Sequence, residues 1–158
     1  MKKLIFFLPA LLMLAFSSCS DDDDLPMVDI EASYSGGVMV DGKLYVVQDD
    51  EFEITSVSAT PLREGAKAAI TSVVYGLDGW IIGASDVAPF GVTFEPETFS
   101  TGKHVLSMRM IVAEEGCTPA VAYSATDVIV VDSSDLIPTP SESDELGVMK
   151  IHPSIQTQ

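Results

Sequence analysis

The strongest constraint on the fold is an apolar residue at every second position of the segment HVLSMRMIVA, residues 104–113. The apolar residues of one parity are Leu106, Met108, Met110 and Val112, and the intervening positions include Ser107 and Arg109. Successive side chains of a β-strand point to opposite faces of the sheet. The segment is therefore predicted to be a strand with one face in a hydrophobic core and the other in solvent.

Two Asp-Gly pairs predict tight hairpins. Asp41-Gly42 lies between the apolar runs of VMVDGKLYVV, and Asp78-Gly79 lies between those of AAITSVVYGLDGWIIG. Such a pair between two apolar runs is the strongest short-range hairpin signal. Further runs occur in PFGVTFE, in YSATDVIVVD and in EFEITSVSATP. In the last of these, a change of parity near Ser56 indicates a bulge or a change of register. Without helical periodicity after residue 18, the pattern predicts an all-β protein, an immunoglobulin-like antiparallel β-sandwich of about seven strands.

Changes in composition divide the chain into four predicted parts. Residues 1–18 are expected to form a cleaved lipoprotein signal peptide, residues 19–33 an acidic tether, and residues 34–133 the sandwich. Near residue 136 the sequence becomes rich in Pro, Ser and acidic residues, as in LIPTPSESDELG, which is typical of a linker. Residues 134–158 are therefore expected to be either a loose tail or one added edge strand.

The first residues, MKKLIFFLPALLMLAFSSC, have the layout of a bacterial secretory signal, with a basic start, an apolar run from Leu4 to Phe16, and small residues. As a helix this run would measure about 20 Å, which is short of a hydrocarbon core of about 30 Å, so a permanent span is not expected. Ordinary cleavage would use Ala15 and Ser17. FSSC resembles a lipobox instead, which implies cleavage before Cys19 and a lipid on its thiol, and the polar SDDDD that follows favours this alternative.

The segment CSDDDD resembles the start of surface lipoproteins of the Bacteroidetes, in which acidic residues after the lipidated cysteine act as a surface-export signal. The resemblance implies that role for Ser20, Asp21, Asp22, Asp23 and Asp24. It also implies a protein that is lipid-anchored in the outer membrane and exposed at the cell surface. The alternative is a solvated, self-repelling spacer.

The charge of the chain excludes one class of partner. Removal of residues 1–18 would leave six basic and 24 acidic residues, a net charge of −18. Such a surface repels phosphate backbones and anionic headgroups, so nucleic acid is not expected as a partner. The lipid itself would be the membrane attachment. If Cys19 is lipidated, Cys117 has no disulfide partner, and stability must come from apolar packing.

The segment VVYGLDGWIIGASDVAPFGVTFEPETFSTGKHVLSMRMIV, residues 73–112, resembles the central part of bacterial immunoglobulin-like domains that are appended to surface glycosidases and adhesins. The matching positions are Asp78, Gly79, Ile82, Gly83, Ala88, Pro89, Phe90, Gly102 and His104. The following AEEGCTPAVAYSATD forms a longer loop than the family has. The resemblance implies a module that spaces, presents or binds, because the fold itself carries no chemistry.

None of the common enzyme signatures occurs in the sequence. Cys117 follows Glu114 and Glu115, whose carboxylates would raise a thiol pKa, and neither His104 nor His152 is placed as its base. We therefore expect an inert thiol and a structural role for His104. The acidic runs QDDEFE and DDDD lack the glycine of a calcium loop, and no ligands occur at metal spacing. A non-enzymatic protein without metal or cofactor is predicted.

Trp80 is the residue singled out for binding. It follows the Asp78-Gly79 turn, and Tyr75 or Tyr123 could complete a platform on which sugar rings stack. The alternative is a core position, which is common for a lone Trp in an immunoglobulin-like sandwich. The leading hypothesis is a surface lipoprotein that serves adhesion, assembly or binding of a surface protein. The second is a glycan-binding accessory protein of a polysaccharide-uptake system.

Overall fold

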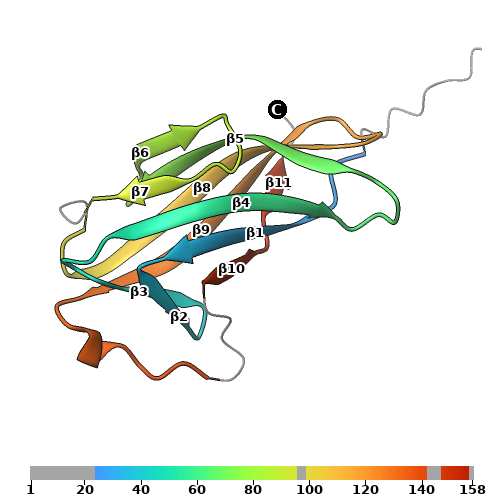
Figure 1. Ribbon diagram of the computed structural model, residues 1–158. Helices are drawn as coiled ribbons and strands as arrows, with labels where there is room; N and C mark the ends of the chain where they lie inside the picture. Colours follow the sequence, from blue (N-terminus) through green and yellow to red (C-terminus); the bar gives the residue numbers. More distant parts are fainter. Residues whose placement is uncertain (1–23, 96–98, 142–146, 157–158) are drawn as a thin grey trace, which may run out of the picture.

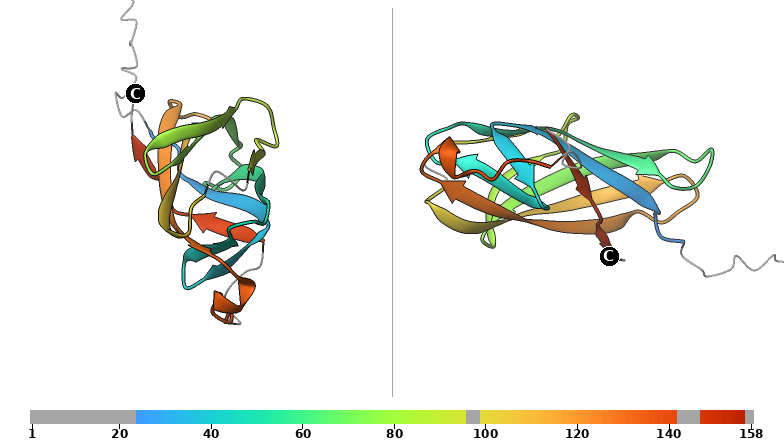
Figure 2. Two further views of the ribbon diagram at one scale, coloured as in Figure 1. Left: turned by 90° about the vertical axis from the view of Figure 1, so that its left-hand side faces the viewer. Right: turned by 90° about the horizontal axis from the view of Figure 1, so that it is seen from below.

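Two β-sheets packed face to face make up the fold, as the computed structural model shows for residues 24–95, 99–141 and 147–156 (Figure 1). Most strands run along the long axis of the molecule, and the two layers can be followed in the turned views (Figure 2). The strands in these residues are β1 (Val28–Ser35), β2 (Gly37–Val40), β3 (Lys43–Val47), β4 (Phe52–Pro61), β5 (Ala68–Leu77), β6 (Trp80–Ser85), β7 (Val92–Phe94), β8 (Gly102–Glu114), β9 (Ala120–Val131), β10 (Val148–Ile151) and β11 (Ser154–Gln156). A 3-10 turn, η2, spans Ser134–Leu136.

The smaller sheet has the order β10-β1-β4-β7, and the larger has the order β2-β3-β9-β8-β5-β6, with β11 also beside β9. Neighbouring strands are antiparallel except β3 and β9, which are parallel. The predicted fold class, an all-β immunoglobulin-like sandwich, is confirmed. The chain uses more strands than the expected number of about seven, because both flanking segments and several short pieces join the sheets.

The core lies between the sheets and follows the alternation that the sequence predicts. In β8 the inward residues Leu106, Met108, Met110 and Val112 are no more than 1% exposed, whereas Arg109 is exposed. Rings from the other elements, Phe52, Phe94 and Phe99, pack together with centroids 5.1 to 6.3 Å apart. Each fully buried side chain of this size stabilises the fold by about 1.5–3 kcal/mol. Apolar packing can therefore hold the domain without a disulfide.

The predicted hairpin turns are confirmed in backbone geometry. Asp41 and Gly42 have φ of 49° and 73°, and Asp78 and Gly79 have φ of 49° and 86°. Positive φ at both central residues is the geometry of the two-residue turn that matches the twist of antiparallel strands. The bulge expected near Ser56 is also present, because the register of β1 and β4 shifts between the pairs Ser33–Ser56 and Tyr34–Ile54.

The sandwich extends beyond the predicted limits of 34 and 133. Residues 28–33, expected in the tether, lie in β1, which pairs with β4 on one side and β10 on the other. The physical reason is a second alternating pattern, with Val28, Ile30 and Ala32 buried and Asp29 and Glu31 exposed. The part of the tether that the structure describes is therefore confined to residues 24–27.

The C-terminal segment supplies one strand to each sheet. β10 forms the edge of the smaller sheet beside β1, and β11 pairs with residues 121–123 of β9. Met149 and Ile151 are buried in the core, which explains why a segment with linker composition ends in ordered strands. Residues 134–158 thus contain two added strands, where a loose tail or one edge strand was expected.

The predicted signal peptide, Cys19, and the export residues Ser20, Asp21, Asp22 and Asp23 lie outside the described residues, and Asp24 is exposed at their border. No helix in the described part of the chain is long and apolar enough to cross a bilayer.

Candidate functional site

The hairpin of β5 and β6 holds Trp80 on the surface. Trp80 is the first residue of β6 and is 78% exposed, and Ile81 beside it is 77% exposed. A register shift between Tyr75 and Gly76 places Trp80 opposite Leu77. A Cβ at Gly76 would lie 2.6 Å from the hydroxyl of Ser107 and 3.3 Å from the carbonyl oxygen of Trp80. Glycine is therefore required at position 76, where β5 lies close to Ser107 of β8. The exposure of Trp80 excludes a core position for its side chain.

Arg109 and Tyr123 lie on the same outer face of the larger sheet. They are directly opposite each other on β8 and β9, and Tyr123 is 41% exposed. A shallow hollow of about 170 Å³ on this face is lined by both residues together with Trp80 and Ile81. We call these four residues, Trp80, Ile81, Arg109 and Tyr123, the outer-face platform.

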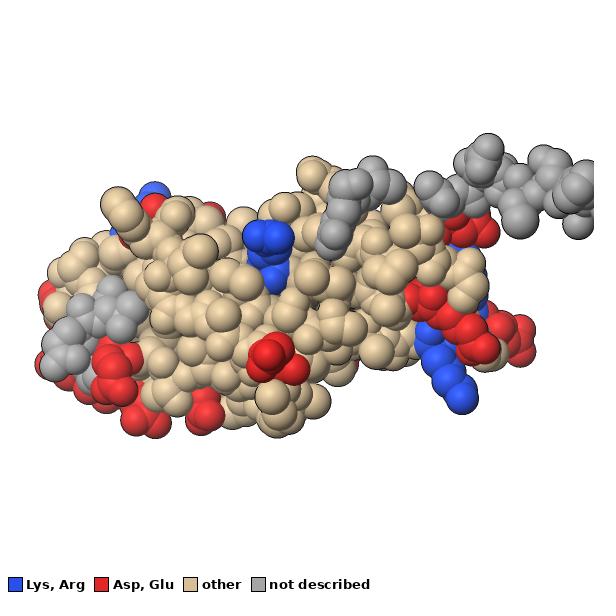
Figure 3. Space-filling model, turned by 90° about the horizontal axis from the view of Figure 1, so that it is seen from above, with Lys and Arg blue, Asp and Glu red and all other residues tan. Residues whose placement is uncertain are grey.

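Charged groups are unevenly distributed over the surface of the molecule (Figure 3). Acidic groups gather at the two ends of the molecule, and the broad middle part between them shows only isolated charged groups (Figure 3). Acidic residues near one end include Asp49, Asp50 and Glu51, and those near the other include Asp24, Glu64 and Glu115. The outer-face platform thus combines apolar and aromatic side chains with the cation of Arg109, on a strongly acidic protein.

Tyr75 also lines this hollow, but it offers no exposed ring on which a sugar could stack, contrary to the prediction. Its side chain is 0% exposed, and its hydroxyl donates a hydrogen bond to the carbonyl oxygen of Phe90. Burial raises the pKa of Tyr75 to about 12. The cause is the parity of β5, because Val73, Tyr75 and Leu77 point to the core, whereas Arg109 and Tyr123 of the neighbouring strands point outward. Closeness to Trp80 in sequence did not predict a common face.

An Asp–His pair that the sequence did not predict fixes the turn next to Trp80. Asp78 Oδ2 lies 2.7 Å from His104 Nδ1, and the other ring nitrogen lies 2.7 Å from the carbonyl oxygen of Ser100. Asp78 Oδ1 also accepts a hydrogen bond of 2.8 Å from the backbone N–H of Val105. The only signal in the sequence was that Asp78 and His104 both match the immunoglobulin-like pattern.

The geometry of this pair indicates a structural role. Both nitrogens of His104 face acceptors, so the doubly protonated imidazolium satisfies the arrangement best. The hydrogen bond to Asp78 raises the pKa of His104, and the same bond lowers the pKa of Asp78. Because both nitrogens are hydrogen-bonded, the imidazole ring connects the β5–β6 turn to the start of β8. This agrees with the structural role expected for His104.

Cys117 lies in a charged cluster at the end of the molecule where the tether enters. Arg63 Nη1 lies 2.9 Å from its Sγ, and Glu114 Oε2 lies 3.7 Å from the same atom. Burial raises the pKa of the Cys117 thiol, and Glu114 adds to this increase while Arg63 opposes it. Because the thiolate is the nucleophilic form, a raised pKa makes this thiol a poor nucleophile near neutral pH.

The side chain of Glu114 is fully buried and joins the same cluster to the tether. Its Oε2 accepts a hydrogen bond of 2.6 Å from the backbone N–H of Met27, and its Oε1 lies 3.8 Å from Arg63 Nε. Arg63 also donates to the carbonyl oxygen of Leu25 and lies 3.9 Å from Asp24. The four residues 24–27 are therefore held against this end of the sandwich.

Within residues 24–95, 99–141 and 147–156, no group of three or more His, Cys, Asp or Glu side chains is arranged to hold a metal ion.

Comparison with known proteins gives no matching family model and no matching curated protein. Among solved structures, the fibronectin(III)-like modules of Clostridium thermocellum CbhA align with 17% identity and a TM-score of 0.37, covering 60% of this chain and 92% of that chain. The class of this protein is defined by its own two stacked sheets, an immunoglobulin-like β-sandwich.

Proposed function

We propose that the chain is a non-enzymatic lipoprotein, anchored in the outer membrane through Cys19 and exposed at the cell surface, whose sandwich binds a partner protein in adhesion or assembly. The observation that carries this proposal is the exposure of Trp80 and Ile81 at 78% and 77% beside Arg109 and Tyr123. Trp, Tyr and Arg are the residues that contribute most at protein interfaces. Folded monomers rarely leave large apolar side chains grouped in solvent.

The position of the tether supports this proposal. From Cys19 to Asp24 a fully extended chain would span about 17 Å, so a lipid on Cys19 would keep the start of β1 close to the membrane. The β4–β5 and β8–β9 loops lie at the same end, as the pairs Val28–Pro61 and Ala68–Glu114 indicate. Trp80 follows the far end of β5, whose ten residues span about 30 Å. The outer-face platform would thus be presented away from the bilayer.

A glycan is the second candidate ligand, and one observation favours it. Trp80 and Tyr123 line one hollow, and the guanidinium group of Arg109 borders the same hollow. Aromatic faces stack on the apolar side of sugar rings, and Arg109 could donate hydrogen bonds to hydroxyl or carboxylate groups. This version of the function is a glycan-binding accessory protein of a polysaccharide-uptake system.

Two measurements test the proposal. Mass spectrometry of the mature protein should find a lipid on Cys19 as the first residue; an unmodified cysteine or an N-terminus at another residue would overturn the anchor. For the ligand, cross-linking on intact cells and a glycan array should each be run with the natural chain and with Trp80→Ala.

The matched control is Leu136→Ala, because Leu136 is 61% exposed but lies outside the platform. Loss of a cross-linked protein partner with Trp80→Ala alone would support adhesion or assembly. Loss of a glycan signal with Trp80→Ala alone would support the second candidate. If both variants bind like the natural chain, the outer-face platform is not the binding surface.

A further inference from the structure

Along one edge of strand β9, the pairing with neighbouring strands is interrupted. Its other edge pairs with β8 continuously from Ala120 to Val130. On the interrupted edge, β11 pairs with residues 121–123 and β3 pairs with residues 128–131. Among the described residues, no strand pairs with this edge from Ser124 to Asp127. Since every second residue of a strand directs its N–H and C=O toward the same neighbour, backbone donors and acceptors face this gap.

The sequence explains why both neighbouring strands stop at the gap. The residue before β11 is Pro153, which has no backbone N–H to continue the ladder. On the other side, β3 begins at Lys43 directly after the Asp41-Gly42 turn, which reverses the chain. The gap is four residues long, about 13 Å of extended strand.

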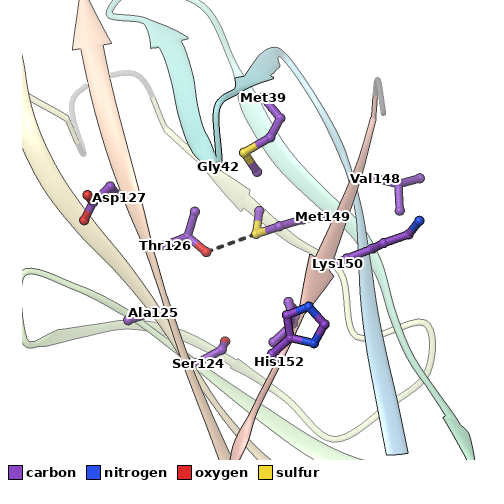
Figure 4. A pocket seen from close by; sticks show the side chains of 11 residues that line it. Met39, Gly42, Ser124, Ala125, Thr126, Asp127, Val148, Met149, Lys150 and His152 are labelled. Carbon is purple, nitrogen blue, oxygen red and sulfur yellow. Dashed lines mark hydrogen bonds between the residues drawn. The ribbon is translucent and has the colours of Figure 1, made fainter. Parts of the chain in front are cut away.

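A slot in the surface lies at this gap. It has a volume of about 580 Å³, and its walls come from β9 and from β10, the edge strand of the smaller sheet (Figure 4). Its apolar lining includes Met39, Val148, Met149 and Ile151. Thr126 Oγ1 lies 3.2 Å from Met149 Sδ across the slot (Figure 4). This volume is within the range of sites that hold a ligand.

The inward face of β9 changes character at the slot. Ala122, Val128 and Val130 are buried, whereas Ser124 and Thr126 between them are small hydroxyl residues that line the slot. Ser124 Oγ is buried and has no hydrogen-bond partner among the described residues. A buried hydroxyl without a partner costs about 1–3 kcal/mol, so an occupant that hydrogen-bonds it would recover that energy.

We propose that this slot binds a short extended segment of a partner polypeptide, which pairs with the free edge of β9 at Ser124–Asp127. Backbone donors and acceptors in strand spacing are what an added strand satisfies, and this mode of recognition takes affinity from the main chain. The apolar lining would contact a side chain of the segment that points into the slot. The Ser124 hydroxyl would form a hydrogen bond with the backbone of the segment. The slot is lined by one acidic residue, Asp127, and one basic residue, Lys150, so its charge favours neither an acidic nor a basic segment. Backbone hydrogen bonds would therefore contribute most to selection of the occupant.

The same geometry limits the segment that fits. Pro153 and the Asp41-Gly42 turn close the two ends of the gap, so about four residues can pair. A chain terminus or the tip of a loop meets this requirement, whereas a long strand does not. The slot is separate from the outer-face platform, since Ser124 and Thr126 point inward and Arg109 and Tyr123 point outward.

The first test is amide hydrogen exchange on the full chain in detergent micelles. We expect the gap-facing amides of residues 124–127 to exchange at least about tenfold faster than the amides of residues 128–131, which β3 covers. Equal protection of both groups in the free protein would overturn the proposal, because the edge would already be satisfied.

The second test uses phage-displayed random heptapeptides selected against the same full-length protein. A selected peptide, once synthesised, should slow exchange at the gap-facing amides of residues 124–127 by at least about tenfold. Failure to enrich any peptide, or protection elsewhere on the molecule, would overturn the proposal. Concentration-dependent dimerisation that protects these same amides would also overturn it, by assigning the slot to a second copy of this chain.

Two substitutions of the same kind complete the test. Ser124→Phe fills the slot and should weaken the peptide by at least about tenfold, which is roughly 1.4 kcal/mol. Ser58→Phe, on the exposed face of β4, should leave its affinity unchanged. Equal affinity of the peptide for Ser124→Phe would contradict binding in the slot. If Ser124→Phe does not fold, the exchange measurement on the natural chain decides. Binding that survives Trp80→Ala distinguishes this slot from the proposed platform.

Discussion

Asp78 Oδ2 lies 2.7 Å from His104 Nδ1, and this contact ties the hairpin that carries Trp80 to the first residues of β8. The turn that precedes Trp80 is therefore held by a pair of groups that titrate.

The Asp78–His104 pair should make stability depend on pH. Because the folded state raises the pKa of His104, its contribution is present below the ordinary value of 6.5 and is lost as pH rises through the folded pKa. The folded state lowers the pKa of Asp78, so its contribution is present above 3.8 and is lost as pH falls. The melting temperature relative to a His104→Gln variant should be greatest between about pH 4 and 6.5. A difference that stays constant from pH 4 to 9 would contradict this linkage.

Arg63 should matter more than its half-exposed position indicates. The change Arg63→Met would leave the fully buried carboxylate of Glu114 with a backbone hydrogen bond but without its cation. We expect a loss of about 1–3 kcal/mol in the free energy of unfolding, measured with urea. Lys67→Met, in the same loop region, is the control and should change stability by less than about 0.5 kcal/mol. Equal effects of the two substitutions would show that the Arg63–Glu114 contact contributes nothing.

The hydroxyl of Tyr75 should contribute to stability, whereas that of Tyr123 should not. Tyr75→Phe removes a buried donor and leaves the carbonyl oxygen of Phe90 without it, so we expect a cost of about 1–2 kcal/mol. Tyr123 is 41% exposed, so Tyr123→Phe should lie within about 0.5 kcal/mol of the natural chain. Chemical denaturation of both variants checks this, and a neutral Tyr75→Phe would contradict the assigned bond.

Gly36 and Gly65 have similar backbone conformations but differ in the space available for a side chain. Their φ angles are +78° and +77°, but a Cβ at Gly36 would overlap the carbonyl oxygen of Glu51, whereas a Cβ at Gly65 meets nothing within 4 Å. Gly65→Ala should cost about 1–2 kcal/mol, the ordinary penalty for this conformation. Gly36→Ala should cost more than about 3 kcal/mol or prevent folding, because the β1–β2 corner must move. Similar losses in thermal denaturation for both would refute the predicted overlap.

The sequence predicted those parts of the fold that depend on neighbouring residues. The alternation in β8, the two Asp-Gly turns and the bulge near Ser56 are local, and the structure confirms them. The alternation of β1 is a weak signal in the sequence, because its eight residues follow an acidic run and contain Asp29 and Glu31. β10 and β11 are too short for a periodic signal, at four and three residues.

The candidate site was less predictable, because it depends on register between distant strands. Trp80 and Tyr123 were named from residue type alone, and Arg109 was predicted only to face solvent. Whether they meet is decided by the pairing of Arg109 with Tyr123 and by the register shift at Gly76, which no local pattern encodes. Tyr75 was misassigned for the same reason. The Asp78–His104 pair joins residues 26 positions apart across two strands.

The position of β1 between β4 and β10 has a consequence for the order of assembly. β1 is the first strand in the chain, and one of its two neighbours, β10, is nearly the last. Contacts between segments far apart in sequence form slowly, since the chain entropy of closing a long loop must be overcome first. A chain that is released progressively from its N-terminus can therefore pair β1 with β4 early, but the other edge of β1 stays uncovered until residues 148–151 arrive. The smaller sheet can therefore be completed only after residues 148–151 have been synthesised.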